Sequence, residues 1–272
     1  MTAQRIECHL SIPGPQPGVL EPLCAVSGLP KQRLKDAMDK GAVWLTRKDS
    51  TQRLRRKTRP LQAGDLIHLY YDESVLKQRA PEPELVADEG DYSIWDKPKG
   101  MYSQGSRWGD HCTITRWAEK HLQPQRNAFL VHRLDRAASG LIIIAHKKQT
   151  AAAFARLFRQ RRIDKHYHAR VHGEWSLQAE VLQLETMLDD KTAVTCVKAL
   201  AYDAEHSQTQ LDVAIATGRK HQIRRHLAEA GYPIVGDRLY GQNDDDHELA
   251  LRAYHLAFDS PVDGRPMVYS VS

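Results

Sequence analysis

Short apolar runs separated by turn residues fill the chain from Tyr92 onward, and this pattern predicts a sheet. Two stretches have helical spacing instead: residues 149–162, and residues 220–229, which are followed by the helix terminator Gly231. Many strands and few helices, without regular strand–helix alternation, indicate an α+β fold with a mixed, mostly antiparallel sheet. Strands are expected for residues 91–97, 128–134, 140–147, 165–173, 181–188, 192–203, 209–216, 255–261 and 267–272.

The first 80 residues show a different order of elements. Pro30 and Gly41 delimit a short amphipathic helix, residues 42–49 have the pattern of a strand, and a Gly-Asp turn leads into another strand. This order of helix, strand, basic loop and strand resembles the small S4-type RNA-binding module. The resemblance implies an earlier helix near residues 19–26, although several prolines make that stretch irregular.

The length of 272 residues is enough for one large domain and a smaller one. A segment with two prolines and several acidic residues separates the two patterns, as an exposed connector would. We therefore expect an S4-like domain over residues 1–80, a connector over residues 81–90 and a larger domain over residues 91–272.

Positive charge is concentrated in the smaller domain. Residues 1–80 carry 14 Lys and Arg against 8 Asp and Glu, whereas the rest of the chain carries 25 against 26. A basic cluster suits a polyphosphate partner, although such a run can also be a solvated loop. The candidate RNA-binding residues are Lys31, Arg33, Lys35, Arg53, Arg55, Arg56 and Lys57.

Several other classes of protein do not fit the sequence. The longest apolar run, residues 141–145, is far shorter than the roughly 18–20 residues of a membrane span, and we expect a cytoplasmic protein with no membrane partner. The four cysteines form no C-x-x-C pair, so neither a zinc site nor a disulfide framework is indicated. His166, His168 and His172 share one face of an expected strand, but no carboxylate follows at ligand spacing, and we predict no metal.

One acidic residue, Asp135, has an unusual setting. Two expected strands flank its loop, so the sheet would hold the loop from both sides, and Arg133 and Arg136 bracket it. An aspartate in such a loop often only hydrogen-bonds its own backbone. A rigid support and two neighbouring cations are also what a catalytic carboxylate needs.

The string H-R-L-D at residues 132–135, followed by Ser139 and Gly140, resembles the signature of the RluA-type family of RNA pseudouridine synthases, whose catalytic aspartate is the Asp of that string. Ala138 departs from the pattern, because the family usually has a threonine there. The resemblance implies the pseudouridine synthase fold, a central mixed sheet flanked by helices, and an isomerase that acts on RNA. Four further stretches agree in the family's order, namely D-K-P-K-G at residues 96–100, K-x-Y at 165–167, T-G-R-x-H-Q-I-R at 217–224 and G-D-R-L-Y-G at 236–241.

The chemistry explains why these residue types are needed. Isomerising uridine breaks the bond between ribose and N1 and rejoins the base through C5, with no redox change, so we expect no cofactor. The resemblance makes Asp135 the catalytic carboxylate, pairs Arg219 with it, and stacks Tyr167 on the target uracil. Whether Asp135 adds to the base, adds to the sugar or abstracts a proton stays open. The residues expected to bind the substrate or RNA phosphates are Arg133, Lys165, Ile223, Lys97 and Arg224.

Other functions remain open at this stage. The chain could be a transfer-RNA rather than a ribosomal-RNA enzyme, although the S4-like module favours ribosomal RNA, or a catalytically inactive RNA-binding protein. A nucleoside glycosidase also uses carboxylates at a ribose carbon but would release free uracil. The sister RsuA-type subfamily usually has glycine where this chain has His132. We expect a monomer that binds RNA and not DNA.

Overall fold

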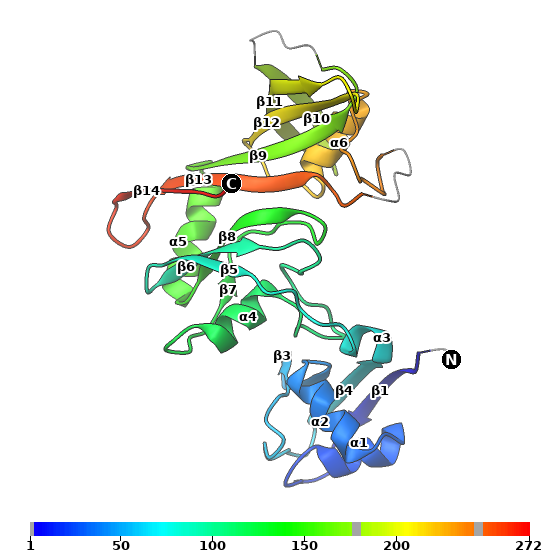
Figure 1. Cartoon of the computed structure of the whole chain (residues 1–272). Helices are drawn as coiled ribbons and strands as arrows, with labels where there is room; N and C mark the ends of the chain where they lie inside the picture. Colours follow the sequence, from blue (N-terminus) through cyan, green and yellow to red (C-terminus); the bar gives the residue numbers. More distant parts are fainter. Residues whose placement is uncertain (1–2, 176–180, 242–246) are drawn as a thin grey trace. The chain divides into compact units, whose positions relative to one another are not determined.

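The computed structural model describes residues 3–175, 181–241 and 247–272 (Figure 1). The chain forms two compact units. One consists of Met1–Ala80 together with Gln104–Trp117, and the other of Pro81–Ser103 with Ala118–Ser272. No helix in these described ranges is both long enough and apolar enough to cross a membrane.

The N-terminal unit is built on a four-stranded antiparallel sheet with the strand order β1-β4-β2-β3. Leu23, Leu34 and Met38 from its helices share one buried core with Leu45 and Leu69 from its strands. The expected first helix is present despite the prolines. The elements are β1 (Arg5–Ser11), α1 (Leu20–Ser27), α2 (Lys31–Asp39), β2 (Val43–Arg47), β3 (Ser50–Arg53), β4 (Leu66–Asp72) and α3 (Glu73–Leu76).

Two arginines of the basic run make contacts within the N-terminal unit. Arg53 Nε lies 3.0 Å from Asp110 Oδ2, and its guanidinium stacks over Trp44 at 4.2 Å. Arg55 pairs with the same carboxylate and donates to Asp39 O at 2.9 Å. These two arginines therefore hold residues 104–117 within the N-terminal unit.

The other basic residues of this set lie at the surface of the unit. Lys57 Nζ pairs with Asp39 Oδ2 at 3.1 Å, and Arg33 donates to Gln4 Oε1 at 3.1 Å. Lys31 pairs with Glu21, Lys35 is half-buried and Arg56 is exposed.

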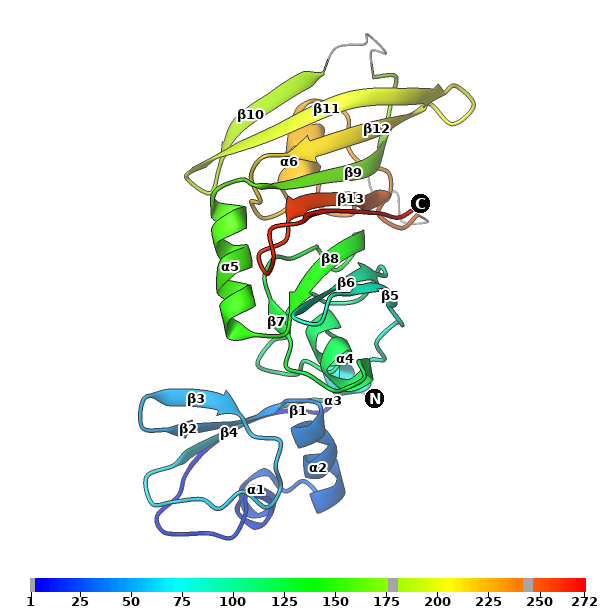
Figure 2. The same ribbon diagram turned by 90° about the vertical axis from the view of Figure 1, so that its left-hand side faces the viewer.

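The second unit contains a large sheet with the strand order β10-β11-β12-β9-β13-β8-β6-β5, joined by β14 on β13 and β7 on β8. Among the described strand pairs of this sheet, only β13 with β8 is parallel, which confirms the expected mixed, mostly antiparallel α+β fold (Figure 2). The strands are β5 (Glu84–Asp88), β6 (Tyr92–Lys97), β7 (Phe129–Leu130), β8 (Ser139–Ala145), β9 (Ile163–His172), β10 (Leu182–Leu188), β11 (Lys191–Asp203), β12 (Gln208–Ile215), β13 (Leu251–Asp259) and β14 (Pro266–Ser270).

Two helices of this unit pack their apolar faces against the sheet. In α5 (Lys148–Arg159), Phe154 meets Tyr92 and Phe258 in edge-to-face contacts at ring distances of 5.1 and 5.4 Å. α6 (Gln222–Glu229) lies against β10 and β11. Both helices match the sequence prediction to within three residues at each end.

Two segments differ from the expected domain plan. The expected connector contains β5, which pairs with β6 as part of the larger sheet. Residues 104–117 lie within the expected larger domain, residues 91–272, but belong to the N-terminal unit. α4 (Ile114–His121), which the apolar pattern did not indicate, runs from this segment into the second unit.

Candidate active site

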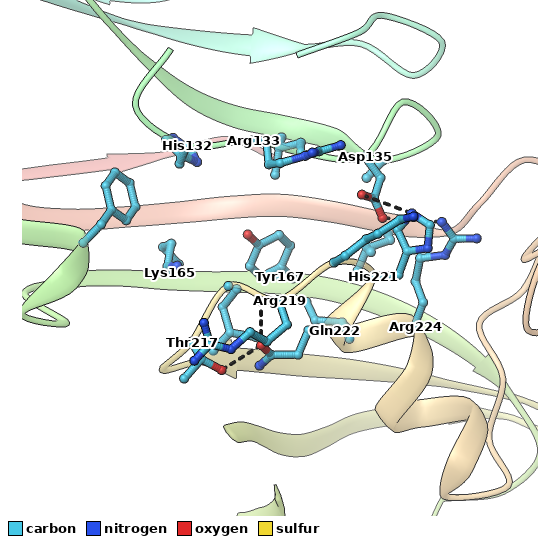
Figure 3. Close-up of a pocket in the computed structure, with 18 of the residues that line it drawn as sticks. His132, Arg133, Asp135, Lys165, Tyr167, Thr217, Arg219, His221, Gln222 and Arg224 are labelled. Carbon is cyan, nitrogen blue, oxygen red and sulfur yellow. Dashed lines mark hydrogen bonds and ion pairs between the residues drawn. The ribbon is translucent and has the colours of Figure 1, made fainter. Parts of the chain in front are cut away.

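Asp135 lies in the loop between β7 and β8, and it lines a pocket of about 500 Å³ in the second unit (Figure 3). The Ser103 hydroxyl holds the start of the loop, because it accepts from Leu134 N at 3.0 Å and donates to Leu134 O at 2.6 Å. Gly100 N donates to Arg136 O at 2.8 Å on the other side of the carboxylate. The loop is thus fixed on both sides of Asp135, by Ser103 and Gly100 and not by two flanking strands as the sequence predicted.

The end of the loop depends on a glycine. Gly140 has a φ of +110°, and a Cβ there would lie 2.1 Å from Ala253 O of the parallel strand β13. A side chain at this position would push β13 away from β8. Gly140 therefore lets the two strands pair directly behind the loop that contains Asp135.

Two nitrogen groups face the Asp135 carboxylate, one on each oxygen. Arg224 Nη1 lies 3.4 Å from Oδ2, and His221 Nε2 lies 3.7 Å from Oδ1. The side chain of Asp135 is 18% exposed, so it remains open to the pocket. This geometry offers a solvent-accessible carboxylate a nearby positive charge.

Arg224 is itself held by a second carboxylate. Its Nε and Nη2 donate to Asp237 Oδ2 at 2.8 Å and Oδ1 at 2.6 Å, and both side chains are almost fully buried. Burial opposes the charged forms, but the bidentate contact outweighs it, so the pKa of Arg224 is raised and that of Asp237 is lowered. Asp237 also accepts from the backbone N–H groups of Leu239 and Tyr240 at 3.0 and 3.1 Å.

Arg219 does not pair with Asp135, which corrects the sequence-based expectation. Its Nε and Nη2 donate to Thr192 O at 3.3 and 3.2 Å, although the residue lines the same pocket. The Gln222 side chain organises this turn, because its Oε1 accepts from Thr217 Oγ1 at 2.7 Å and from Arg219 N at 3.0 Å. The guanidinium beside the carboxylate belongs to Arg224, at the other end of the same motif.

Tyr167 lies on β9 with its ring directed into the pocket (Figure 3). Burial and the nearby charge of Asp135 raise the pKa of its phenol well above the ordinary value, so the hydroxyl stays protonated at physiological pH. The ring is 7% exposed and can offer a face to a flat ligand only from inside the pocket.

Lys165 and His132 lie at the end of the pocket away from Asp135 (Figure 3). Burial lowers the pKa of Lys165 to about 8, and its ammonium lies 5.4 Å from the Phe158 ring. Burial also lowers the pKa of His132 to about 3, and its neutral Nε2 accepts from Ile143 N at 2.9 Å. His132 therefore ties the segment before Asp135 to β8.

The remaining expected substrate contacts divide into two groups. Arg133, which is exposed, and the buried Ile223 line the pocket as expected. Lys97 does not, because it is 0% exposed and donates to the carbonyls of Pro98, Met101 and Ala138 at 3.1, 3.0 and 2.7 Å. Arg224 lines the pocket but is buried, and it pairs with the carboxylates of Asp135 and Asp237.

Sequence reasoning missed His221, Asp237 and Tyr240 as parts of this site. All three belong to the motifs at residues 217–224 and 236–241. The sequence therefore identified the motifs, but not the contacts that these residues make. In the part of the chain that the structure describes, no group of His, Cys, Asp and Glu side chains is placed to hold a metal ion.

The chain is similar in sequence to several known proteins. A family model described as RNA pseudouridylate synthase matches residues 91–229, about half of the chain. A ribosomal large subunit pseudouridine synthase C from Haemophilus influenzae is 26% identical over 282 residues, covering 92% of this chain and 85% of that protein. A tRNA pseudouridine synthase C from Vibrio parahaemolyticus is 32% identical over 225 residues, covering 70% and 90%.

A solved structure shows the same fold. The human RNA pseudouridylate synthase domain containing 1 matches with a TM-score of 0.60 at 20% identity, covering 72% of this chain and 85% of that one.

Proposed function

Because the chain belongs to the RluA-type family of RNA pseudouridine synthases, we propose that Asp135 is the carboxylate with which this isomerase converts uridine to pseudouridine. The observation that carries the proposal is the placement of Asp135 at a pocket wall, between Arg224 and His221. A carboxylate with a fixed cation on one oxygen keeps its orientation, while its exposed side stays available to a ligand.

The reaction needs no partner beyond the nucleotide itself. The N1–C1′ bond breaks, the base turns within the pocket, and a C5–C1′ bond forms; C5 then loses its proton and N1 gains one. Asp135 either adds to the reacting nucleotide or removes a proton from its ribose, and both routes return the carboxylate unchanged. A pocket that retains the detached uracil is required on either route.

Tyr167 and Arg133 are proposed to hold the nucleotide. The Tyr167 phenol is protonated, so its ring can stack on uracil without placing a negative charge beside Asp135. Arg133 is exposed at the pocket and can occupy the gap that a flipped nucleotide leaves in the RNA. Lys165 and Arg219 line the same pocket and supply further positive charge.

Ribosomal RNA is the substrate that we propose. The relative named a ribosomal large subunit enzyme aligns with 92% of this chain, an extent that must include most of the N-terminal unit. The relative named a tRNA enzyme aligns with only 70%. We propose that residues 1–80 form an S4-like RNA-binding domain; its α1, α2, β2 and β4 lie where the sequence predicted two helices and two strands.

The test is Asp135→Asn, which keeps the size of the side chain and removes its charge. Total RNA from a strain lacking the gene is incubated with each protein, and pseudouridine is mapped by sequencing. The parent protein should restore one or a few sites in ribosomal RNA, and the variant should restore none. Equal modification by both proteins would refute the role of Asp135, and release of free uracil by the parent would indicate a glycosidase instead.

A further inference from the structure

The Gly236–Gly241 segment contributes a second residue to the surroundings of Asp135. Tyr240 Oη lies 3.0 Å from His221 Nδ1, and His221 Nε2 faces Asp135 Oδ1 at 3.7 Å. Tyr240 does not line the pocket, whereas His221 does. A chain of three side chains therefore runs from outside the pocket to the carboxylate.

The backbone of His221, which contacts both Tyr240 and Asp135, has a strained conformation. Its φ is 53°, in the left-handed region that non-glycine residues rarely adopt, and it occupies the position before the first residue of α6. Such conformations persist where the surrounding structure fixes them, often at functional sites. No side-chain capping bond accounts for the conformation.

The hydrogen bond to Tyr240 decides where the proton of a neutral His221 lies. If Tyr240 donates to Nδ1, the proton is on Nε2 and points toward the carboxylate of Asp135. The opposite tautomer would direct the Nε2 lone pair at a negatively charged oxygen, which is unfavourable. The electrostatics of the site therefore select the tautomer in which His221 donates to Asp135.

The charges around the ring keep it neutral. Burial lowers the pKa of His221, and the cations of Arg224 and Lys220 lower it further, while the anions of Asp135 and Asp237 act in the opposite direction. The net direction is downward, so the imidazole is a neutral donor at physiological pH.

We propose that Tyr240 and His221 act as positioning residues: Tyr240 fixes the tautomer and the ring of His221, which donates its Nε2–H to Asp135 when a nucleotide fills the pocket. The proposal rests on the catalytic role of Asp135 stated above. The present separation of 3.7 Å is longer than a hydrogen bond, as is common for catalytic contacts before the substrate binds. The Gly236–Gly241 segment then supports both carboxylate oxygens of Asp135. Asp237 acts on Oδ2 through Arg224, and Tyr240 acts on Oδ1 through His221.

Tyr240→Phe isolates the hydroxyl. The phenylalanine ring keeps the edge contact with His221, at 5.7 Å, and the contact with the Arg224 guanidinium, at 5.2 Å. RNA labelled with tritium at uridine C5, taken from a strain lacking the gene, reports the reaction because the C5 proton is lost to water. We expect the rate at saturating RNA to fall about 5- to 20-fold, while the RNA concentration for half-saturation and the thermal midpoint change little.

A double-mutant cycle separates this role from a structural one. His221→Gln places an amide N–H near the position of Nε2 and has no tautomer, so it should be faster than His221→Ala by about 10-fold. In the His221→Gln protein, Tyr240→Phe should cost less than 2-fold. The positioning role of Tyr240 and His221 is refuted if Tyr240→Phe alone lowers the rate less than 2-fold. It is also refuted if Tyr240→Phe lowers the rate equally in the parent and in the His221→Gln protein.

Asp135→Asn is measured beside these variants. If Asp135→Asn is inactive while Tyr240→Phe is fully active, the positioning role of Tyr240 is refuted and the proposed function is retained. If it is as active as the parent protein, both proposals fail.

Discussion

The buried pair of Arg224 and Asp237 gives the sharpest prediction about stability. Asp237→Ala removes two hydrogen bonds to the guanidinium, at 2.8 and 2.6 Å, and the acceptor of two backbone N–H groups. The side chains of Arg224 and Asp237 are 6% and 1% exposed, so water cannot readily replace what is lost. Removing one partner of such a pair costs about 3–5 kcal/mol, because the other charge stays buried.

The expected loss lies toward the lower end of that range. Arg224 would keep its contact with Asp135, at 3.4 Å, as partial compensation. A loss of about 3 kcal/mol corresponds to a fall in Tm of roughly 6–12 °C for a domain of this size class. The rate of pseudouridine formation should fall as well, because Arg224 loses the group that aims it.

Thermal unfolding followed by circular dichroism measures the effect, with two transitions allowed for the two units. Asp259→Ala is the matched control, since it removes an aspartate paired with Arg162 at 2.7 Å with both side chains more than half exposed. The control should leave Tm unchanged. A fall of less than 2 °C for Asp237→Ala would mean that the pair does not stabilise the fold.

Three further predictions follow from individual side chains. Burial lowers the pKa of Lys165 to about 8, so its positive charge is lost as the pH rises through that value; RNA affinity should weaken between pH 7 and 9, and Lys165→Arg, measured by the same filter-binding assay, should abolish this pH dependence. Lys97→Met leaves three buried carbonyls without their donor, and we expect it to lower the free energy of unfolding by roughly 2–3 kcal/mol while the salt dependence of RNA binding stays unchanged. Gly140→Ala forces a Cβ against Ala253 O and should cost more than about 4 kcal/mol or prevent folding, whereas Gly218→Ala, with no atom within 4 Å of the added carbon, should leave Tm unchanged.

The large sheet could be predicted because each strand carries its own signal. The apolar runs at residues 140–147 and 192–203, for example, became β8 and β11 with small shifts at their ends. The motif positions also placed Asp135, Tyr167 and Lys165 at one pocket, as expected. Local patterns suffice when the elements pair in the way that their length and polarity favour.

Among the elements that were missed, β1 and α4 had signals in the sequence. In β1, Ile6, Cys8 and Leu10 alternate with polar residues, which is the period of a half-buried strand. Before α4, Thr113 Oγ1 accepts from Arg116 N at 3.1 Å, the pattern of a helix N-cap. Both signals are short and lie beside irregular segments, so they are weaker than those of the long strands.

The functions of individual basic residues could not be predicted, because side-chain partners are set by the fold. Lys97 belongs to a motif and has the charge to bind phosphate, yet three carbonyls that approach it only in the folded sheet enclose its ammonium. Asp96, its neighbour, pairs with Arg252 Nη2 at 2.6 Å, from a strand far away in the sequence. The motif at residues 96–100 thus stabilises the structure beside the site and does not line the pocket.

The exchange of roles between Arg219 and Arg224 has a physical reason. Both arginines belong to one motif, but His221 turns the backbone between them, so only Arg224 reaches the carboxylate from α6. Arg224 then makes a tight bidentate contact with Asp237 and a longer one with Asp135. A carboxylate bound tightly by two N–H groups would be a poor nucleophile or base, because its lone pairs would be occupied. The short pair therefore fixes the guanidinium, and the longer contact holds Asp135 less tightly than Asp237 is held.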